Sequence, residues 1–208
     1  MIPPLHVVTD DAVLARSDFA ARAAAVLAAG GPRVALHLRA RETSAARLYA
    51  LADALRGPAG AAGARLLAND RIDLALAAGL DGVHLRERSL PAAVARGLLP
   101  AGRLIGVSVH TEETARAVAP DADYLVVGTV FATSSHPGRP GGGSALVQRA
   151  AAAAGSRPVI AIGGITPERV AEVLAAGAHG VAVLSGVWSA ADPEAAVQGY
   201  LEPLGRCA

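Results

Sequence analysis

Short apolar runs alternate regularly with longer, alanine-rich amphipathic stretches along this chain. Short apolar runs bounded by turn residues are typical of buried strands, and the longer stretches are typical of helices. Strict strand-helix alternation predicts a parallel sheet. Eight such units within 208 residues predict one domain, residues 1–208, folded as a single α/β (β/α)8 TIM barrel at the small end of its size range.

The expected strands are Leu5–Thr9, Arg33–Leu38, Arg65–Asn69, Gly82–Leu85, Leu104–Ser108, Tyr124–Gly128, Pro158–Ile162 and Gly180–Leu184. The expected helices lie near Ser17–Ala29, Thr43–Leu55, Arg71–Ala78, Pro91–Leu98, Thr111–Val118, Gly143–Ala154, Pro167–Ala176 and Pro193–Leu201. The alternative fold is an open doubly wound sheet, which usually carries a glycine fingerprint after its first strand. The residues at that point, Thr9-Asp10-Asp11, do not form one.

Composition excludes several classes of protein. Hydrophobic residues make up 52% of the chain, but no apolar run approaches the roughly 20 residues of a membrane span. Residues Met1 to His6 show no basic segment followed by a long apolar stretch, so we expect no signal peptide and a cytoplasmic location. The single cysteine, Cys207, rules out an internal disulfide. The formal net charge is +1 and no basic cluster is interleaved with aromatics, so we expect no nucleic-acid partner.

Glycines follow the last two expected strands, which run into Ile162-Gly163-Gly164-Ile165 and Leu184-Ser185-Gly186. Barrel enzymes often hold a phosphate at this place with backbone N–H groups, and glycine lets the backbone approach closely. Tight turns alone would also explain these glycines. Because both loops carry them, we favour a phosphate site.

Polar residues end the second expected strand. Period-two alternation turns Ala35, His37 and Arg39 toward the barrel interior. An arginine in a barrel mouth needs an anionic partner, which could be the substrate or Asp70. His37 is either a site residue or a hydrogen-bonded core histidine.

Further candidates follow the third to sixth strands. Asn69-Asp70 could contribute a carboxylate for Mg²⁺ or pair with Arg39, and His84 and His110 are expected near the same mouth. The loop at 129–143 is longer than the others, polar and glycine-rich. It could be a mobile lid over the site or a plain connection.

Taken in order, these segments resemble the thiamin-phosphate synthase and thiazole tautomerase superfamily, and the resemblance covers nearly the whole chain. The segments that carry it are His6-Val7-Val8-Thr9-Asp10, Leu38-Arg39-Ala40-Arg41, Asn69-Asp70-Arg71-Ile72-Asp73-Leu74-Ala75, Gly82-Val83-His84-Leu85, Ser108-Val109-His110, Ala122-Asp123-Tyr124, Pro158-Val159-Ile160-Ala161-Ile162-Gly163-Gly164-Ile165-Thr166-Pro167 and Val183-Leu184-Ser185-Gly186. The resemblance implies a barrel and a small phosphorylated thiazole ligand.

The synthase branch joins a hydroxymethylpyrimidine diphosphate to thiazole phosphate and releases diphosphate with Mg²⁺. Its metal site implies one carboxylate at Asp70 and a second at the position of Ser89. The branch usually has Gln at His37 and Lys at Arg41 and His136. This chain therefore departs from the synthase pattern at four positions.

The tautomerase branch shifts a proton on a thiazole carboxylate phosphate and needs no metal. The stretch His37–Arg41, the glycine spacing of the 129–143 loop and the ending Val183–Val187 look closer to it. Its catalytic histidine is replaced by Thr129, so His136 or His37 could be a relocated acid/base.

We therefore expect a thiazole tautomerase-like isomerase without a cofactor. The alternatives are the Mg²⁺-dependent synthase, with Asp70 as a metal ligand, and a catalytically silent phosphate-binding paralogue. The oligomeric state stays open, a homo-oligomer included. The expected ligand contacts are Arg39, Arg41, Asn69, Asp70, Ser108, His110, Gly163, Gly164, Ser185 and Gly186.

Overall fold

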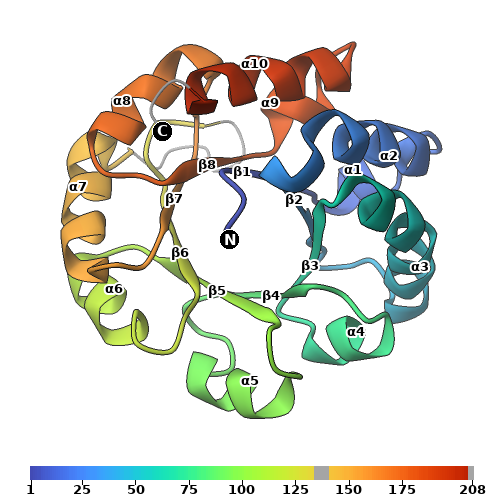
Figure 1. Ribbon diagram of the computed structural model, residues 1–208, viewed down its shortest axis with the longest axis horizontal. Helices are drawn as coiled ribbons and strands as arrows, with labels where there is room; N and C mark the ends of the chain where they lie inside the picture. The colour runs from blue at the N-terminus through green and yellow to red at the C-terminus, as the bar shows by residue number, and fades with distance from the viewer. Residues whose placement is uncertain (134–140, 206–208) are drawn as a thin grey trace.

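The computed structural model describes residues 1–133 and 141–205, and within them eight parallel strands close into a barrel surrounded by helices (Figure 1). The strands are β1 (Leu5–Val8), β2 (Val34–Leu38), β3 (Arg65–Asn69), β4 (Gly82–Leu85), β5 (Leu104–Val109), β6 (Tyr124–Val127), β7 (Val159–Ile162) and β8 (Gly180–Val183). They lie in sequence order, and β1 pairs with both β2 and β8. The predicted (β/α)8 barrel is confirmed.

The helices are α1 (Asp11–Leu14), α2 (Phe19–Gly30), α3 (Ala45–Ala62), α4 (Ile72–Ala77), α5 (Ala92–Leu98), α6 (Glu112–Val118), α7 (Gly143–Ala154), α8 (Val170–Ala175), α9 (Ser185–Trp188) and α10 (Pro193–Gly205), with 3₁₀ turns η1 (Gly31–Arg33) and η2 (Pro167–Arg169). The short helices α1 and α9 were not predicted, because four residues are too few to show a helical period. Helix α3 continues beyond the predicted end at Leu55, since Leu55 and Ala59 share its buried face.

Two layers of apolar side chains fill the fold, and their alternation confirms the predicted register of β2. Leu36 and Leu38 pack outward against the helices, whereas Ala35 belongs to the cluster inside the barrel. Ile2 packs against this inner cluster, and Figure 1 shows the N-terminus within the ring of strands. The amino end of the barrel is therefore plugged by apolar groups, which leaves the carboxyl end for a polar site.

Among the described residues, no helix combines the length and the apolar character that crossing a membrane would require.

Candidate functional site

The loop after β7 carries two glycines that the backbone requires. Gly163 and Gly164 have φ angles of 106° and 61°, which side chains rarely adopt. A Cβ on Gly163 would lie 2.6 Å from Cγ2 of Thr129, and a Cβ on Gly164 would meet the carbonyl oxygen of Ala132. A side chain at Gly164 would therefore displace the β6–α7 connection. The packing of this loop against the β6–α7 connection therefore requires both glycines.

The terminal helix α10 holds this loop together with the loop after β8. The Tyr200 hydroxyl donates to the carbonyl oxygen of Ile165 at 3.0 Å, and a Cβ on Gly186 would collide with the same hydroxyl. Gly186 directly follows Ser185, the first residue of α9. Tyr200 thus lies beneath both glycine loops. It was missed in the sequence because it is distant along the chain and lies on an ordinary amphipathic helix.

Arg39 follows β2 at the carboxyl end of the barrel and is half-buried. Among residues 1–133 and 141–205 its guanidinium has no ion-pair partner. Burial, followed by the neighbouring positive charge of Arg41, lowers the pKa of Arg39. After burial and the neighbouring His37, the charge of Arg39 also lowers the pKa of the buried His84. A partly buried, unpaired cation is a position that an anion would stabilise.

Arg41 stands on a loop that one carboxylate organises. The Asp11 carboxylate accepts hydrogen bonds from the backbone N–H groups of Arg41 at 2.9 Å, Glu42 at 3.1 Å and Thr43 at 2.8 Å. The Thr43 hydroxyl also donates to it at 2.7 Å. These hydrogen bonds, of which the one from the Thr43 hydroxyl has the largest effect, hold the pKa of Asp11 well below its usual range. The loop carrying Arg41 is therefore fixed beside Arg39. The sequence could not identify this role, because Asp11 lies 30 residues away from Arg41.

Asp70 does not pair with Arg39, contrary to one of the two sequence expectations. Its Oδ2 lies 2.5 Å from Nε of Arg86, and its Oδ1 accepts from the Arg86 backbone N–H at 2.9 Å. The Ser89 hydroxyl also donates to Oδ1. The reason is local, because Arg86 and Ser89 lie on the loop after β4, the strand that pairs with β3. Asp70 fastens this loop to the end of β3.

This arrangement does not fit a magnesium site. Mg²⁺ prefers carboxylate and other oxygen ligands in octahedral geometry. Here the two oxygens of Asp70 are occupied by Arg86 and Ser89, and the serine hydroxyl donates its proton to the carboxylate. In the part of the chain that the structure describes, no three His, Cys, Asp or Glu side chains are grouped so that they could hold a metal ion.

Histidines line the barrel interior. His37 is 1% exposed, and both of its ring nitrogens are in contact: Nε2 lies 2.8 Å from Nδ1 of His6, and Nδ1 lies 3.1 Å from Oδ1 of Asn69. Of the two sequence interpretations, the hydrogen-bonded core histidine is the one that the geometry matches. Burial lowers the pKa of His37 to about 4. With no free nitrogen, His37 is poorly placed to exchange protons with a ligand.

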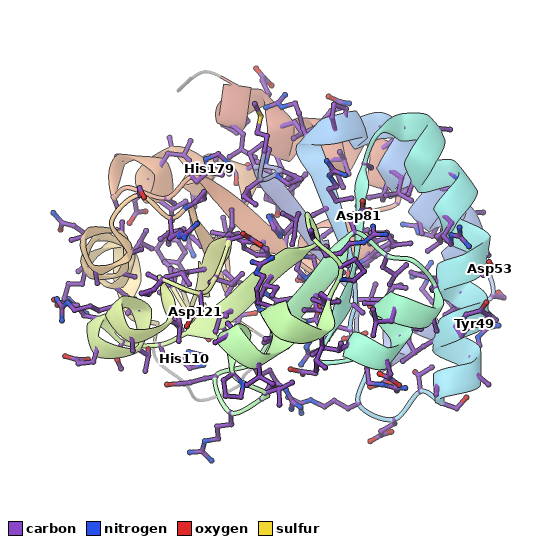
Figure 2. All side chains as sticks on the ribbon, turned by 60° about the horizontal axis from the view of Figure 1, so that its bottom comes forward. Tyr49, Asp53, Asp81, His110, Asp121 and His179 are labelled. Carbon is purple, nitrogen blue, oxygen red and sulfur yellow. The ribbon has the colours of Figure 1, made fainter. Side chains whose placement is uncertain are left out.

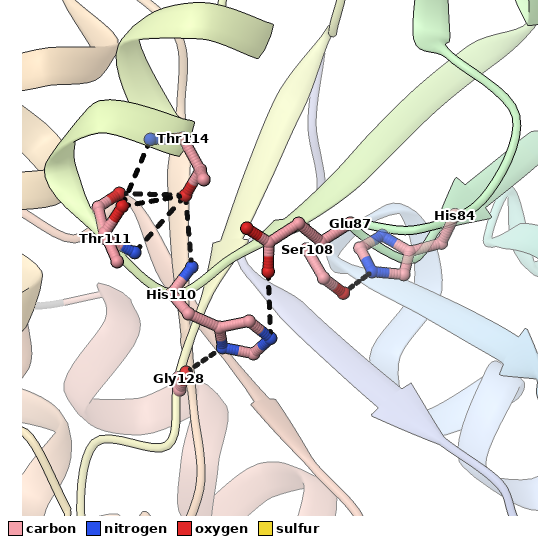
Figure 3. Close-up of polar contacts among 7 residues, drawn as sticks. All are labelled: His84, Glu87, Ser108, His110, Thr111, Thr114 and Gly128. Atoms are coloured by element: carbon pink, nitrogen blue, oxygen red, sulfur yellow. Dashed lines mark hydrogen bonds and ion pairs between the residues drawn. The ribbon is translucent and has the colours of Figure 1, made fainter.

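Ser108 and His110 stand at the end of β5 (Figure 3). Ser108 Oγ lies 2.8 Å from Nε2 of the buried His84. The exposed His110 donates from Nδ1 to the Gly128 carbonyl oxygen at 2.5 Å, and its Nε2 is 3.8 Å from a carboxylate oxygen of Glu87. Figure 2 shows His110 and His179 toward opposite ends of the molecule. His110 is therefore a histidine at the carboxyl end with an accessible ring nitrogen.

The 129–143 loop begins against the end of β7, and its last residues bond back to its own first residues. Val130 and Phe131 donate to the carbonyl oxygens of Ile162 and Gly163, each at 2.9 Å, and Gly142 donates to that of Thr129 at 2.9 Å. The half-buried Thr129 lies beside Gly163. His136, the leading candidate for an acid/base, and the middle of the proposed lid lie outside the described residues, so both stay predictions.

Comparisons with known proteins point to one family. The model of the family described as "Thiamine monophosphate synthase" matches residues 5–187. The "Thiamine-phosphate synthase" of Moorella thermoacetica is 44% identical over 182 residues, which cover 86% of each chain. The "Putative thiamine-phosphate synthase" of Geobacter sulfurreducens is 46% identical over 193 residues, covering 91% of this chain and 88% of that protein.

A solved structure shows the same barrel. The thiamine phosphate pyrophosphorylase from Pyrococcus furiosus superposes with a TM-score of 0.84 at 29% identity and covers 98% of this chain and 96% of its own. The sequence resemblance named the superfamily correctly, but the relatives do not carry the tautomerase name that the sequence favoured. The family match over most of the chain, the curated relatives and the shared barrel together establish that this chain belongs to the thiamine monophosphate synthase family.

Proposed function

We propose that this protein is a thiamine-phosphate synthase, a transferase that joins hydroxymethylpyrimidine diphosphate to thiazole phosphate and releases diphosphate. This was the alternative in the sequence analysis, and the names of the relatives favour it over the isomerase. The structural observation that carries the proposal is the unpaired, half-buried Arg39 at the same end of the barrel as the glycine loops.

Each substrate would bring its own anionic group to this end. The diphosphate would lie against Arg39 and Arg41, whose charges neutralise the electron pair that leaves with it when the carbon–oxygen bond breaks. The thiazole phosphate would lie against the backbone of Gly163-Gly164 and Ser185-Gly186. Two separate anion-binding sites, one for each phosphorylated substrate, suit a transfer reaction.

Magnesium enters no step of this scheme. The family resemblance implies two carboxylates for the metal, whereas this chain has a carboxylate at only one of those two positions, Asp70, which is already bound by Arg86 and Ser89. The protein's own cations are therefore the groups that we place against the leaving diphosphate. Arg86, ion-paired to Asp70, adds a guanidinium near the same edge.

The tautomerase remains a second candidate, because Ser89 replaces a carboxylate that the synthase would use. It requires an acid/base near the ligand. His37 is buried with both ring nitrogens in contact, so this role would fall to His110 or His136. A silent phosphate-binding paralogue is the third possibility.

A paired assay tests these functions. The purified chain is given the pyrimidine diphosphate and thiazole phosphate, with EDTA or with Mg²⁺, and separately the thiazole carboxylate phosphate. We expect thiamine phosphate from the first pair, with and without the chelator. Turnover of the carboxylate alone would establish the isomerase instead, and binding without turnover in either assay would establish the silent paralogue. Synthase activity abolished by EDTA and restored by Mg²⁺ would overturn the metal-free scheme.

A further inference from the structure

A row of polar contacts runs through the barrel interior from the N-terminal segment to the end of β3. The Pro3 carbonyl oxygen lies 3.0 Å from Nε2 of His6, whose Nδ1 lies 2.8 Å from Nε2 of His37. Nδ1 of His37 lies 3.1 Å from Oδ1 of Asn69. Both imidazoles are fully buried, with exposed fractions of 0% and 1%. The row therefore has a carbonyl oxygen at each end and two histidines between.

The three contacts of this row cannot all be hydrogen bonds while both histidines are neutral and the Asn69 oxygen faces His37. Three contacts need three hydrogens: one toward Pro3, one between the rings and one toward Asn69. Two neutral imidazoles carry one N–H each, which gives two. Either the pair holds an additional proton and a positive charge, or one end of the row must change from acceptor to donor.

The surroundings favour the neutral pair. Burial comes first among the causes that lower the pKa of His6 and of His37, and it lowers that of His6 well below the usual value. The titratable groups facing the pair are His84, whose ring is 5.5 Å from that of His37, and Tyr124, 4.9 Å from His6, with His179 at longer range. None of these three is a carboxylate that would stabilise an imidazolium.

Only one end of the row can turn. The Pro3 oxygen belongs to the backbone and can only accept, so it requires a hydrogen on Nε2 of His6. Nδ1 of His6 is then an acceptor, and His37 must donate to it from Nε2. This leaves Nδ1 of His37 as an acceptor. The Asn69 side chain can donate to this nitrogen if its amide group is rotated by half a turn, so that the NH₂ group takes the place of the oxygen. The two orientations have nearly the same shape.

The second polar atom of the Asn69 amide is the one left for a ligand. Asn69 ends β3 at the carboxyl end of the barrel and is 8% exposed. Among the described residues, this second amide atom of Asn69 has no hydrogen-bond partner. It is also absent from the fully buried side-chain atoms that lack a partner, so solvent or a ligand can reach it. We propose that the His6–His37 pair fixes the Asn69 amide so that its carbonyl oxygen faces the mouth, where it selects a ligand group bearing an N–H or O–H donor.

This proposal rests on the proposed function only in taking the carboxyl end as the ligand site. It assigns Asn69 a contact with a donor group and not with a phosphate oxygen, which would need the NH₂ group. His6 and His37 are positioning residues, because they act on the ligand through Asn69. Their effect is to decide between two hydrogen-bonding patterns of one amide.

Nitrogen NMR of the ¹⁵N-histidine-labelled full chain at pH 7, without ligand, tests the proton count. His6→Gln and His37→Gln variants assign the signals, and two-bond couplings from the ring hydrogens identify the signals if either variant fails to fold. We expect both residues to be neutral with the hydrogen on Nε2. A hydrogen on Nδ1 of His37, or an imidazolium in the pair, would overturn the proposal.

Calorimetric titration with inorganic diphosphate tests the polarity of Asn69 separately. Asn69→Ala should change diphosphate affinity less than twofold, whereas the control Arg39→Met should weaken it at least tenfold. Equal losses in the two variants would mean that Asn69 donates to the anion, which contradicts the proposal. If the wild-type chain binds no diphosphate, the proposed function fails, and the NMR result alone decides the role of the pair.

Discussion

Both ends of the barrel hold carboxylates paired with arginines, such as Asp70 with Arg86 at the carboxyl end, but the two ends differ at Arg39. At the amino end, Asp81 precedes β4 and binds the Leu66 N–H at 2.9 Å and the Arg65 guanidinium at 3.0 Å. Asp123 precedes β6 and repeats this pattern with the Ile105 N–H at 2.8 Å and Arg96 at 2.7 Å.

At the carboxyl end, Arg39 has no such partner among the described residues. A carboxylate that satisfies a strand N–H and an arginine together stabilises the fold, whereas a half-buried cation left unpaired costs stability. This difference supports our proposal that the carboxyl end keeps one of its charges for a ligand, whereas the paired charges at the amino end stabilise the fold.

Replacing Arg39 should have the largest effect on activity. Arg39→Met keeps the aliphatic stem but removes the charge that we place against the diphosphate. We expect kcat/KM to fall about 100-fold, or about 2.7 kcal/mol of transition-state stabilisation, while the melting temperature does not fall. The matched control is Arg65→Met at the amino end, which should stay within twofold of wild type. Similar rates for both variants would remove the functional difference between the two ends.

Acid should weaken the fold through the buried histidines near the carboxyl end. Burial lowers the pKa of His37 to about 4, and that of an unfolded histidine is about 6.5. Between these values the unfolded chain binds more protons than the folded one, so stability falls as pH falls. From pH 7 to pH 5, His37 alone should cost about 2 kcal/mol. Urea unfolding at both pH values measures this loss, which His37→Gln should reduce; an equal loss in the variant would show that other groups titrate.

Removing a paired carboxylate at the amino end should affect stability and spare catalysis. Asp123→Asn leaves the Arg96 guanidinium without its charged partner and weakens the bond from the Ile105 N–H. We expect a loss of about 1.5 kcal/mol in the free energy of unfolding, with kcat/KM per folded molecule unchanged. Asp121→Asn, at an exposed position, is the control and should be neutral. A catalytic defect in the Asp123 variant would show that this end also serves the reaction.

The smallest effect is expected at Tyr200. Tyr200→Phe keeps the ring but removes the hydrogen bond to Ile165, which should loosen the two glycine loops. We expect KM for thiazole phosphate to rise about fivefold, or about 1 kcal/mol, with kcat unchanged. Tyr49→Phe, on the exposed face of α3, is the matched control. Steady-state kinetics of both variants measure these effects. A lower kcat with an unchanged KM in the Tyr200→Phe variant would contradict this role.

Local sequence was sufficient for much of the fold. The period-two pattern at the second strand correctly turned Ala35 inward and Leu36 outward, because alternation along a strand depends only on the chain's own geometry. It was less reliable at boundaries. Helix α3 extends through Pro58 to Ala62, since packing of Ala59 against the core outweighs the usual effect of a proline.

The barrel, the family and the end of the barrel at which the polar residues gather could all be predicted from the sequence. The contacts of those residues could not be predicted: Asp70 binds Arg86 and not Arg39, and His37 lies between His6 and Asn69. Periodicity is a property of one strand's own sequence, whereas ion pairs and hydrogen bonds depend on distances between strands. Those distances exist only after the barrel has closed.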